Sequence, residues 1–321
     1  MKTAFMSLIH ISEVIERIRS FPVRKVALQA PEGLKRELPR LAQALRSQGY
    51  DVIISGDPCY GACDLALDTL DYADILVHFG HTPLMNHPKV LFEPVILDVH
   101  IPPLDQAISL LTGPNIGLIS TAQHARVLPR LAEELERHGF SPVIAPPSPR
   151  TPLPGQVLGC TYTAARASKA DELLYFGTGV FHAIGSGIAA GVPVVALDPF
   201  SGKADLIKTD RLLRRRFGII EKARSADRFG IIISQKCGQN RSALAEHLLS
   251  LNTGAVPVLL REVTSDQLQN LGFPCYVNTA CPRLALDDQI RFPVPVLSPI
   301  EFEILCKTRS WDEYEVDEII L

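Results

Sequence analysis

Short runs of β-branched residues alternate with segments of helical periodicity, and this alternation constrains the fold more than any other feature of the sequence. Residues 26–30 predict a strand, residues 34–48 carry apolar side chains at helical spacing, and residues 52–55 predict the next strand. The pattern restarts at residues 116–120 and again at 230–234. Strands separated by helices form parallel sheets of βαβ units, so the sequence predicts an α/β protein.

The chain also resembles itself. Ala, Asp, Leu, Phe and Gly recur at the same positions in residues 73–80 and 170–177. Each of three successive segments offers a strand, a helix, a strand and then a loop that carries a cysteine, and these cysteines are Cys59, Cys160 and Cys281. Internal repetition of this kind predicts three similar α/β units, each a small parallel sheet flanked by helices.

We place the three predicted domains at residues 1–105, 106–218 and 219–321. Ligands bind outside the carboxyl ends of the strands in open parallel sheets. Three such units facing one another would therefore bring their loop cysteines to one central site. Three thiolates at a shared centre form a metal or cluster site with an open position.

Composition excludes several classes of protein. Hydrophobic residues make up 46 % of the chain and the formal net charge is −3, which argues against disorder and against a dedicated nucleic-acid binder. No run approaches the roughly 20 apolar residues of a membrane span. The apolar stretch from Ala4 meets Ser12, Glu13 and Glu16 at once, which is not typical of a signal peptide. We expect a cytoplasmic protein that contacts neither membrane nor nucleic acid directly.

The chain has seven cysteines, an odd number. Without a secretion signal, such a count argues against a disulfide framework and for buried thiols, metal ligands or nucleophiles. Cys59, Cys63, His78 and His81 offer two thiols and two imidazoles, which are the ligands of structural zinc. A zinc-bound binding module is therefore one alternative function, although a turn with two half-buried thiols explains the same residues.

A second alternative is a dinucleotide-dependent oxidoreductase. Gly177 and Gly179 follow a predicted strand and open a helix, and Asp198 ends the next strand about 20 residues later. The glycine spacing differs from the G-x-G-x-x-G fingerprint, so a tight βα turn explains these residues equally well.

Two further loops carry polar side chains suited to a substrate. Gln239 lies in a loop that leaves a strand and enters a helix, and Arg283 follows Cys281. A guanidinium suits carboxylate recognition, although Arg283 could simply pair with Asp287. The segment from Trp311 to Leu321 carries five acidic residues and no basic one, and we interpret it as a solvated tail.

Taken together, the motifs resemble those of the diphthamide synthesis 3-amino-3-carboxypropyl transferases, and most closely the archaeal homodimeric type. The resemblance runs from about residue 26 to 295. The motifs that carry it are Cys-Tyr-Gly-Ala-Cys-Asp at 59–64, His-Phe-Gly-His at 78–81, Leu-Gly-Cys at 158–160, Gly-Val-Phe-His at 179–182, Asp-Pro-Phe at 198–200, Gly-Gln-Asn-Arg at 238–241 and Ala-Cys-Pro-Arg at 280–283.

This resemblance implies a [4Fe–4S] cluster held by Cys59, Cys160 and Cys281, with the fourth iron open to S-adenosylmethionine. It implies reductive cleavage of that cofactor and transfer of its 3-amino-3-carboxypropyl group to a histidine of translation elongation factor 2. No catalytic residue beyond the cluster is expected. A homodimer and an unidentified electron donor are implied as well. For the S-adenosylmethionine pocket we nominate Gln239, Arg283 and His182, on loop position and chemistry.

Overall fold

The structure, a computed structural model, describes residues 8–320, so the start of the apolar stretch at Ala4 lies outside the described residues. The chain forms two compact units. Unit 1 comprises Met1–Leu97 with Pro149–Pro152, and unit 2 comprises Asp98–Ser148 with Leu153–Leu321. Between residues 8 and 320, no helix combines the length and the apolar character needed to cross a membrane.

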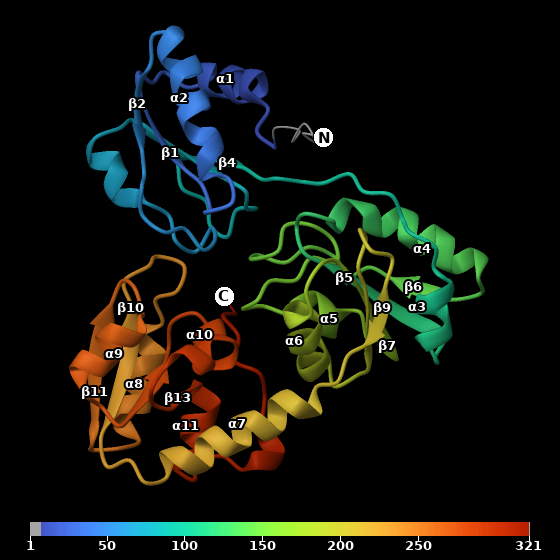
Figure 1. Cartoon of the computed structure of the whole chain (residues 1–321), viewed down its shortest axis with the longest axis vertical. Helices are drawn as coiled ribbons and strands as arrows, with labels where there is room; N and C mark the ends of the chain where they lie inside the picture. The colour runs from blue at the N-terminus through green and yellow to red at the C-terminus, as the bar shows by residue number, and fades with distance from the viewer. Residues whose placement is uncertain (1–7, 321) are drawn as a thin grey trace. The chain divides into compact units, whose positions relative to one another are not determined.

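Unit 1 contains a parallel sheet with strand order β2-β1-β3-β4 (Figure 1). Its strands are β1 (Lys25–Gln29), β2 (Asp51–Ile54), β3 (Ile75–Phe79) and β4 (Val90–Glu93), and its helices are α1 (Ile11–Arg19) and α2 (Leu38–Ser47). In this order β2 lies on one side of β1 and β3 lies on its other side, so the direction in which strands are added reverses at β1. Ligands bind at such switch points in open α/β sheets.

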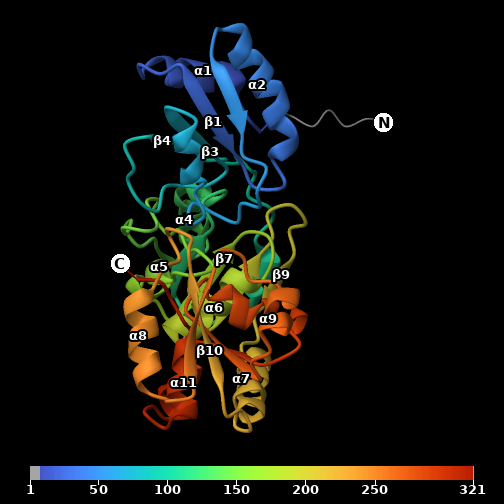
Figure 2. The ribbon, with the colours of Figure 1, turned by 90° about the vertical axis from the view of Figure 1, so that its left-hand side faces the viewer.

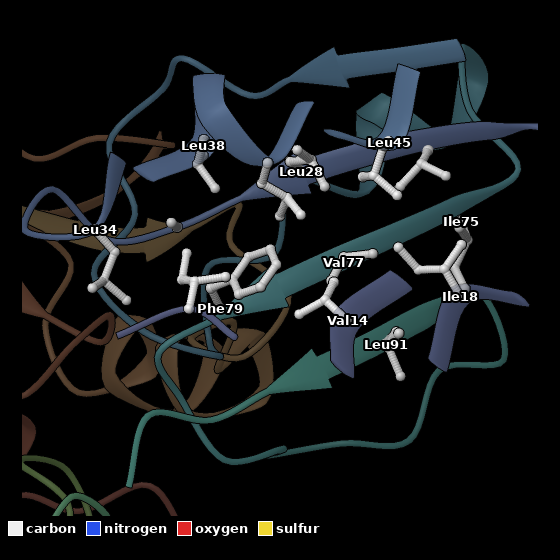
Figure 3. Packing of buried hydrophobic residues seen from close by; sticks show 14 residues of the cluster. Val14, Ile18, Leu28, Leu34, Leu38, Leu45, Ile75, Val77, Phe79 and Leu91 are labelled. Carbon is white, nitrogen blue, oxygen red and sulfur yellow. The ribbon is translucent and has the colours of Figure 1, made fainter. Parts of the chain in front are cut away.

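The core of unit 1 lies between the sheet and its two helices (Figure 3). Leu38, Leu41 and Leu45 of α2 are fully buried and recur at the helical spacing that the sequence predicted. Val14 and Ile18 of α1 pack into the same cluster with alternate side chains of β1 and β3. This face of the sheet is therefore covered by apolar side chains of the two helices.

The first sheet of unit 2 has strand order β6-β5-β7-β8-β9, and only the last pair is antiparallel. Its strands are β5 (Asn115–Ser120), β6 (Ser141–Val143), β7 (Glu172–Phe176), β8 (Val194–Leu197) and β9 (Ala204–Leu206), and its helices are α3 (Asp105–Leu110), α4 (Leu128–Arg137), α5 (Thr163–Ala167) and α6 (Phe181–Ala190). Helix α7 (Asp210–Ala223) then leads to the second sheet of unit 2.

That second sheet is parallel, with strand order β11-β10-β12-β13. Its strands are β10 (Phe229–Ser234), β11 (Ala255–Leu260), β12 (Cys275–Asn278) and β13 (Val296–Leu297), and its helices are α8 (Ser242–Ser250), α9 (Ser265–Leu271), α10 (Arg283–Leu286) and α11 (Pro299–Leu305). Figure 2 shows α8 and α9 on opposite sides of β10. Two separate apolar clusters therefore cover the two faces of this sheet.

All three sheets share one topology, in which the second strand of the segment lies beside the first and the third lies on its other side. The predicted α/β class, with several small parallel sheets flanked by helices, is confirmed.

A repeated five-residue segment, which the sequence analysis did not use, also marks the internal repeat. Leu-Pro-Arg-Leu-Ala opens α2 at residues 38–42 and α4 at residues 128–132, with the proline in the first helical turn each time.

Two sequence expectations need correction. Cys59 and Cys160 follow the second strands of their sheets, but Cys281 follows β12, the third strand of its sheet. All parallel strands of a sheet end at the same edge, so a ligand loop does not have to follow a particular strand. The C-terminal segment is not a solvated tail, because Val316, Asp317 and Ile319 are buried in unit 2.

Candidate functional site

Cys160 lies at the tip of a tight turn in unit 2. The backbones of Leu158 and Thr161 exchange hydrogen bonds, with N···O distances of 3.0 and 3.4 Å, and this leaves Gly159 and Cys160 to make the turn. A Cβ on Gly159 would lie 2.8 Å from Cδ of Arg283 and 2.9 Å from a ring carbon of Phe181. The glycine therefore permits the close approach of two side chains to the half-buried Cys160.

The loop of Cys281 is fixed by the side chain of Asn278. The Asn278 amide nitrogen donates to the carbonyl oxygen of Cys281 at 2.8 Å, and its amide oxygen accepts from the backbone N–H of Ala280 at 3.0 Å. The hydroxyl of Thr279 donates to the carbonyl of Ile232 on β10 at 2.6 Å. The half-buried Cys281 is thus presented at the carboxyl end of β12 by a rigid loop.

One C-terminal segment joins these two cysteine loops. Arg241 donates to the carbonyls of Thr279 and Ala280 and also forms an ion pair with Asp317. Two residues further on, the N–H of Ile319 donates to the carbonyl of Cys160 at 2.8 Å. The segment therefore ties the Cys160 loop to the Cys281 loop.

The side chain of Tyr162 is buried beside the Cys160 loop, where its hydroxyl donates to the carbonyl of Gly159 at 3.3 Å. Burial raises the pKa of its phenol far above the ordinary value, and the negative thiolate forms of Cys160 and Cys281 raise it further. Gly159, next to Cys160, also lies against the side chain of Arg283, two residues after Cys281. Unit 2 by itself therefore brings together the loops of two of the three cysteines that the resemblance names as cluster ligands.

Arg283 and His182 lie beside these loops. The guanidinium of Arg283 sits 4.5 Å from the centre of the Phe181 ring and pairs with Asp287 at 2.6 Å. The ring of His182 stacks on Tyr175 with 6.1 Å between centroids. Burial, together with the nearby Arg283, lowers the pKa of His182 to about 4. The pocket thus presents a cation next to a neutral imidazole.

Gln239, the third nominated pocket residue, lies on a different loop. It is buried in the turn between β10 and α8, where its backbone N–H donates to the carbonyl of Lys236 at 3.0 Å. The adjacent Asn240 side chain donates to Ser234 at the end of β10. Arg241 of the same loop reaches the Cys281 loop, so Gln239 belongs to the carboxyl edge of the second sheet of unit 2.

Unit 1 contains Cys59 within a second arrangement. One ligand atom each from Cys59, His78 and His81 lie within 4.8 Å of one another. Burial, with the charge of Asp64 as a smaller contribution, raises the pKa of the Cys59 thiol to about 12. A thiol in this environment does not ionise at neutral pH unless a cation stabilises the thiolate.

The loop that carries Cys59 is held by a lysine. Lys35 Nζ donates to the carbonyls of Gly56 and Asp57 at 2.9 and 2.7 Å. Cys63 does not belong to the group of three, so the four-ligand zinc set expected as an alternative is not assembled among the described residues.

Comparison with known proteins identifies the family. The family model described as "Putative diphthamide synthesis protein" matches residues 30–315. This chain belongs to that family. The prediction made from its motifs is therefore confirmed, and the match spans both units and all three cysteine loops.

Individual relatives agree with this family assignment. A 2-(3-amino-3-carboxypropyl)histidine synthase from Pyrococcus horikoshii is 36 % identical over 96 % of this chain and 93 % of the relative. Subunit 1 of the synthase from Homo sapiens is 34 % identical over 96 % of this chain and 74 % of the relative. The crystal structure of Dph2 from Pyrococcus horikoshii with a 4Fe–4S cluster superimposes with a TM-score of 0.89 at 35 % identity, covering 97 % of this chain and 94 % of that one.

Neither alternative function finds support among these diphthamide synthesis relatives. The structure also gives a physical reason against the dinucleotide site. Oδ1 of Asp198 accepts hydrogen bonds from the N–H groups of Phe200 and Ser201 at 2.8 and 3.0 Å, so it stabilises its own turn. Gly177 packs against the hydroxyl of Tyr175, and Gly179 has a φ of +72°. These residues form a tight βα turn.

Proposed function

We propose that this chain transfers the 3-amino-3-carboxypropyl group of S-adenosylmethionine to a histidine of translation elongation factor 2, the first step of diphthamide biosynthesis. Its membership of the diphthamide synthesis family supports this activity. The observation that carries the proposal is that the C-terminal segment ties the Cys160 loop to the Cys281 loop, and that Gly159 lies against Arg283.

Cys59, Cys160 and Cys281 are the proposed ligands of a [4Fe–4S] cluster. The donor set fits, because thiolates are the ordinary ligands of such clusters and three of them leave one iron open. When bound and reduced, the cluster supplies the electron that breaks the bond between the sulfonium sulfur and the γ-carbon of S-adenosylmethionine. The protein's own part is to hold the cysteine loops rigid, through Asn278 for Cys281 and the turn at Gly159 for Cys160.

Arg283, His182 and Gln239 are the proposed contacts of S-adenosylmethionine. The Arg283 guanidinium is half exposed and keeps donors beyond its pair with Asp287, which suits the carboxylate of the methionine portion. His182 is held neutral beside it and offers a hydrogen-bonding ring without a competing charge. The Phe181 ring under Arg283 limits how far the guanidinium can swing.

The remaining expectations belong to this proposal. We expect a homodimer, three domains at residues 1–105, 106–218 and 219–321, and an external one-electron donor. The protein substrate is a translation factor, so we place the chain in the cytoplasm. No catalytic side chain beyond the cluster ligands is proposed, and no contact with nucleic acid or membrane.

The test is product analysis of S-adenosylmethionine after anaerobic incubation with the reconstituted, dithionite-reduced protein. We expect 5′-methylthioadenosine together with a four-carbon amino-acid fragment. Predominance of 5′-deoxyadenosine would mean that a different carbon–sulfur bond is broken, and the proposed reaction would be wrong.

Serine variants assign the ligands. Cys59→Ser, Cys160→Ser and Cys281→Ser are each expected to lower iron and sulfide content from roughly four of each per chain and to abolish cleavage. Cys237→Ser is the matched control, since this thiol is exposed and lies outside the proposed set. Full iron loading of any one of the three ligand variants would remove that cysteine from the proposal.

A further inference from the structure

The group of Cys59, His78 and His81 in unit 1 is built from two neighbouring loops at the carboxyl edge of its sheet. Cys59 follows β2, and the two histidines lie at and beyond the end of β3. Gly80 between them has a φ of +91°, a conformation that favours glycine and turns the chain sharply. This turn brings the ring of His81 back to the ring of His78, at 5.2 Å between centroids.

Gln29 fixes which nitrogen of His78 carries its proton. The Gln29 amide nitrogen donates to the carbonyl of Asp64, and its amide oxygen accepts from the N–H of Ala66. The oxygen, 2.9 Å from Nδ1 of His78, can therefore only accept, so His78 carries its proton on Nδ1. With its Nδ1–H directed at Gln29, the ring of His78 keeps a lone pair on Nε2.

That lone pair faces a nitrogen of His81. Because Nε2 of His78 can only accept, Nδ1–H of His81 donates to it at 3.0 Å. A tetrahedral ion with metal–nitrogen bonds of about 2.05 Å separates two ligand nitrogens by about 3.3 Å. The two nitrogens therefore lie within a few tenths of an ångström of the separation that such an ion imposes.

The surroundings match those of metal-binding histidines. A ligating imidazole almost always donates its other N–H to an oxygen that fixes the ring, and Gln29 does this for His78. The buried Asp64 supports this arrangement from the loop of Cys59, because its backbone carbonyl accepts a hydrogen bond from the amide nitrogen of Gln29.

The internal repeat places His81 at the position of a cysteine. β3 pairs with β1 as β12 pairs with β10, and both are the third strand of their sheet. His81 stands three residues after His78, just as Cys281 stands three residues after Asn278. The loop position that carries a proposed cluster ligand in unit 2 therefore carries an imidazole in unit 1.

We propose that the cluster-free protein binds one divalent ion of the zinc class in unit 1 through Cys59, His78 and His81. This inference rests on the proposed function only in that Cys59 is also a proposed cluster ligand. Binding of the ion releases the thiol proton of Cys59, and the proton on Nδ1 of His81 moves to Nε2 of the same ring, so that Nδ1 can bind the ion. The single ion and the cluster then compete for Cys59.

Cobalt(II) is the probe, because it binds the same nitrogen and sulfur ligands as zinc and its complexes absorb visible light. Full-length protein, freed of iron under anaerobic conditions, is titrated with Co²⁺ and then with Zn²⁺. We expect one Co²⁺ per chain, with a thiolate-to-cobalt charge-transfer band and tetrahedral d–d bands that Zn²⁺ abolishes. Absence of the charge-transfer band in the wild-type protein would overturn the proposal.

Variants locate the ion. His81→Ala is expected to weaken Co²⁺ binding at least tenfold, and Cys59→Ser to remove the charge-transfer band. Cys63→Ser is the matched control in the same loop and is expected to keep the wild-type spectrum.

The double variant Cys160→Ser/Cys281→Ser tests whether the Co²⁺ ion lies in unit 1, because it changes residues of unit 2 only and is expected to keep the wild-type spectrum. Loss of the cobalt spectrum in that double variant would show that the ion occupies the cluster cysteines instead.

The same experiments separate this inference from the proposed function. The cobalt titration uses protein without iron and does not involve S-adenosylmethionine. Wild-type protein that cleaves S-adenosylmethionine but never gives the cobalt spectrum would contradict the inference alone. Protein that gives the spectrum, loses it in His81→Ala and yet never cleaves S-adenosylmethionine would contradict the proposed function alone.

Discussion

Arg241 and Asp317 form a bidentate ion pair, in which Nη1 of the arginine lies 2.7 Å from Oδ1 of the aspartate and Nη2 lies 2.8 Å from Oδ2. The same guanidinium also donates hydrogen bonds to the backbone carbonyls of Thr279 and Ala280, the two residues immediately before Cys281. Both members of the pair are largely buried, with side-chain exposures of 11 % and 6 %. A single arginine thus fastens the Cys281 loop to the C-terminal segment, which in turn holds the Cys160 loop.

We expect Asp317→Asn to destabilise unit 2 and to lower iron loading. The amide keeps the shape of the carboxylate but leaves the buried Arg241 without its counter-charge. Breaking a buried pair in this way costs about 3–5 kcal/mol. The free energy of unfolding from urea titration and the iron content after anaerobic reconstitution measure the two effects.

Glu221→Gln is the matched control for that change. Glu221 pairs with Arg224 on the surface of α7, at 2.8 Å and with both side chains more than 40 % exposed. An exposed pair contributes about 0–1 kcal/mol, so this variant is expected to unfold and load iron like the wild type. If Asp317→Asn behaves like its control, the C-terminal segment does not set the geometry of the cysteine loops.

A methyl group at Gly159 is expected to disturb the proposed S-adenosylmethionine pocket. Gly159→Ala places its Cβ against Cδ of Arg283 and the ring of Phe181, both closer than 3 Å, so at least one of these side chains has to move. Overpacking of this kind costs about 1–3 kcal/mol. We expect weaker S-adenosylmethionine binding, measured by equilibrium dialysis on the reconstituted protein.

Gly218 in α7 offers the opposite case. A Cβ there has no neighbour within 4 Å, and the residue lies inside a helix. Gly218→Ala is expected to raise the free energy of unfolding by about 0.4–1 kcal/mol and to leave ligand binding unchanged. If Gly159→Ala also binds S-adenosylmethionine normally, the contact of Gly159 with Arg283 has no role in the pocket.

The sequence predicted most strands of the three sheets because fully buried parallel strands are continuous apolar runs. The bounds of β6 are less predictable. This strand covers Ser141–Val143 and includes Pro142, a residue that usually interrupts a strand. β6 lies at the edge of its sheet, where the missing N–H of a proline costs no ladder hydrogen bond, so a proline there does not end a strand.

The site was less predictable, because its contacts depend on sheet order. The acidic composition of the C-terminal segment favoured a solvated tail, and nothing local signals that Asp317 pairs with Arg241, 76 positions earlier. Gln29 likewise reaches His78 only because β1 and β3 are neighbours in the register that pairs these two residues. Local patterns gave the ligand types, and only the assembled sheets reveal which polar side chains orient them.

Acid is expected to destabilise unit 2 through His182. Burial lowers the pKa of His182 to about 4 in the folded protein, from an ordinary value of 6.5. Between these two pH values the unfolded chain binds a proton that the native state does not, so stability falls as the pH falls from 6.5 toward 4, by at most about 1.4 kcal/mol per pH unit. Above pH 7 this histidine contributes no pH dependence.

Urea unfolding of the wild type and of His182→Asn at pH 7, 6 and 5 measures this contribution. The variant loses ring contacts and starts from lower stability, but its free energy of unfolding is expected to fall less steeply below pH 6.5. Carboxylates titrate in both proteins, so the difference between the two slopes isolates His182. His100→Asn, at an exposed ring, is the matched control for the substitution itself and is expected to unfold like the wild type at pH 7. Equal slopes in wild type and His182→Asn would mean that the folded protein accepts a proton on this ring as readily as the unfolded chain, and the neutral imidazole beside Arg283 would have to be abandoned.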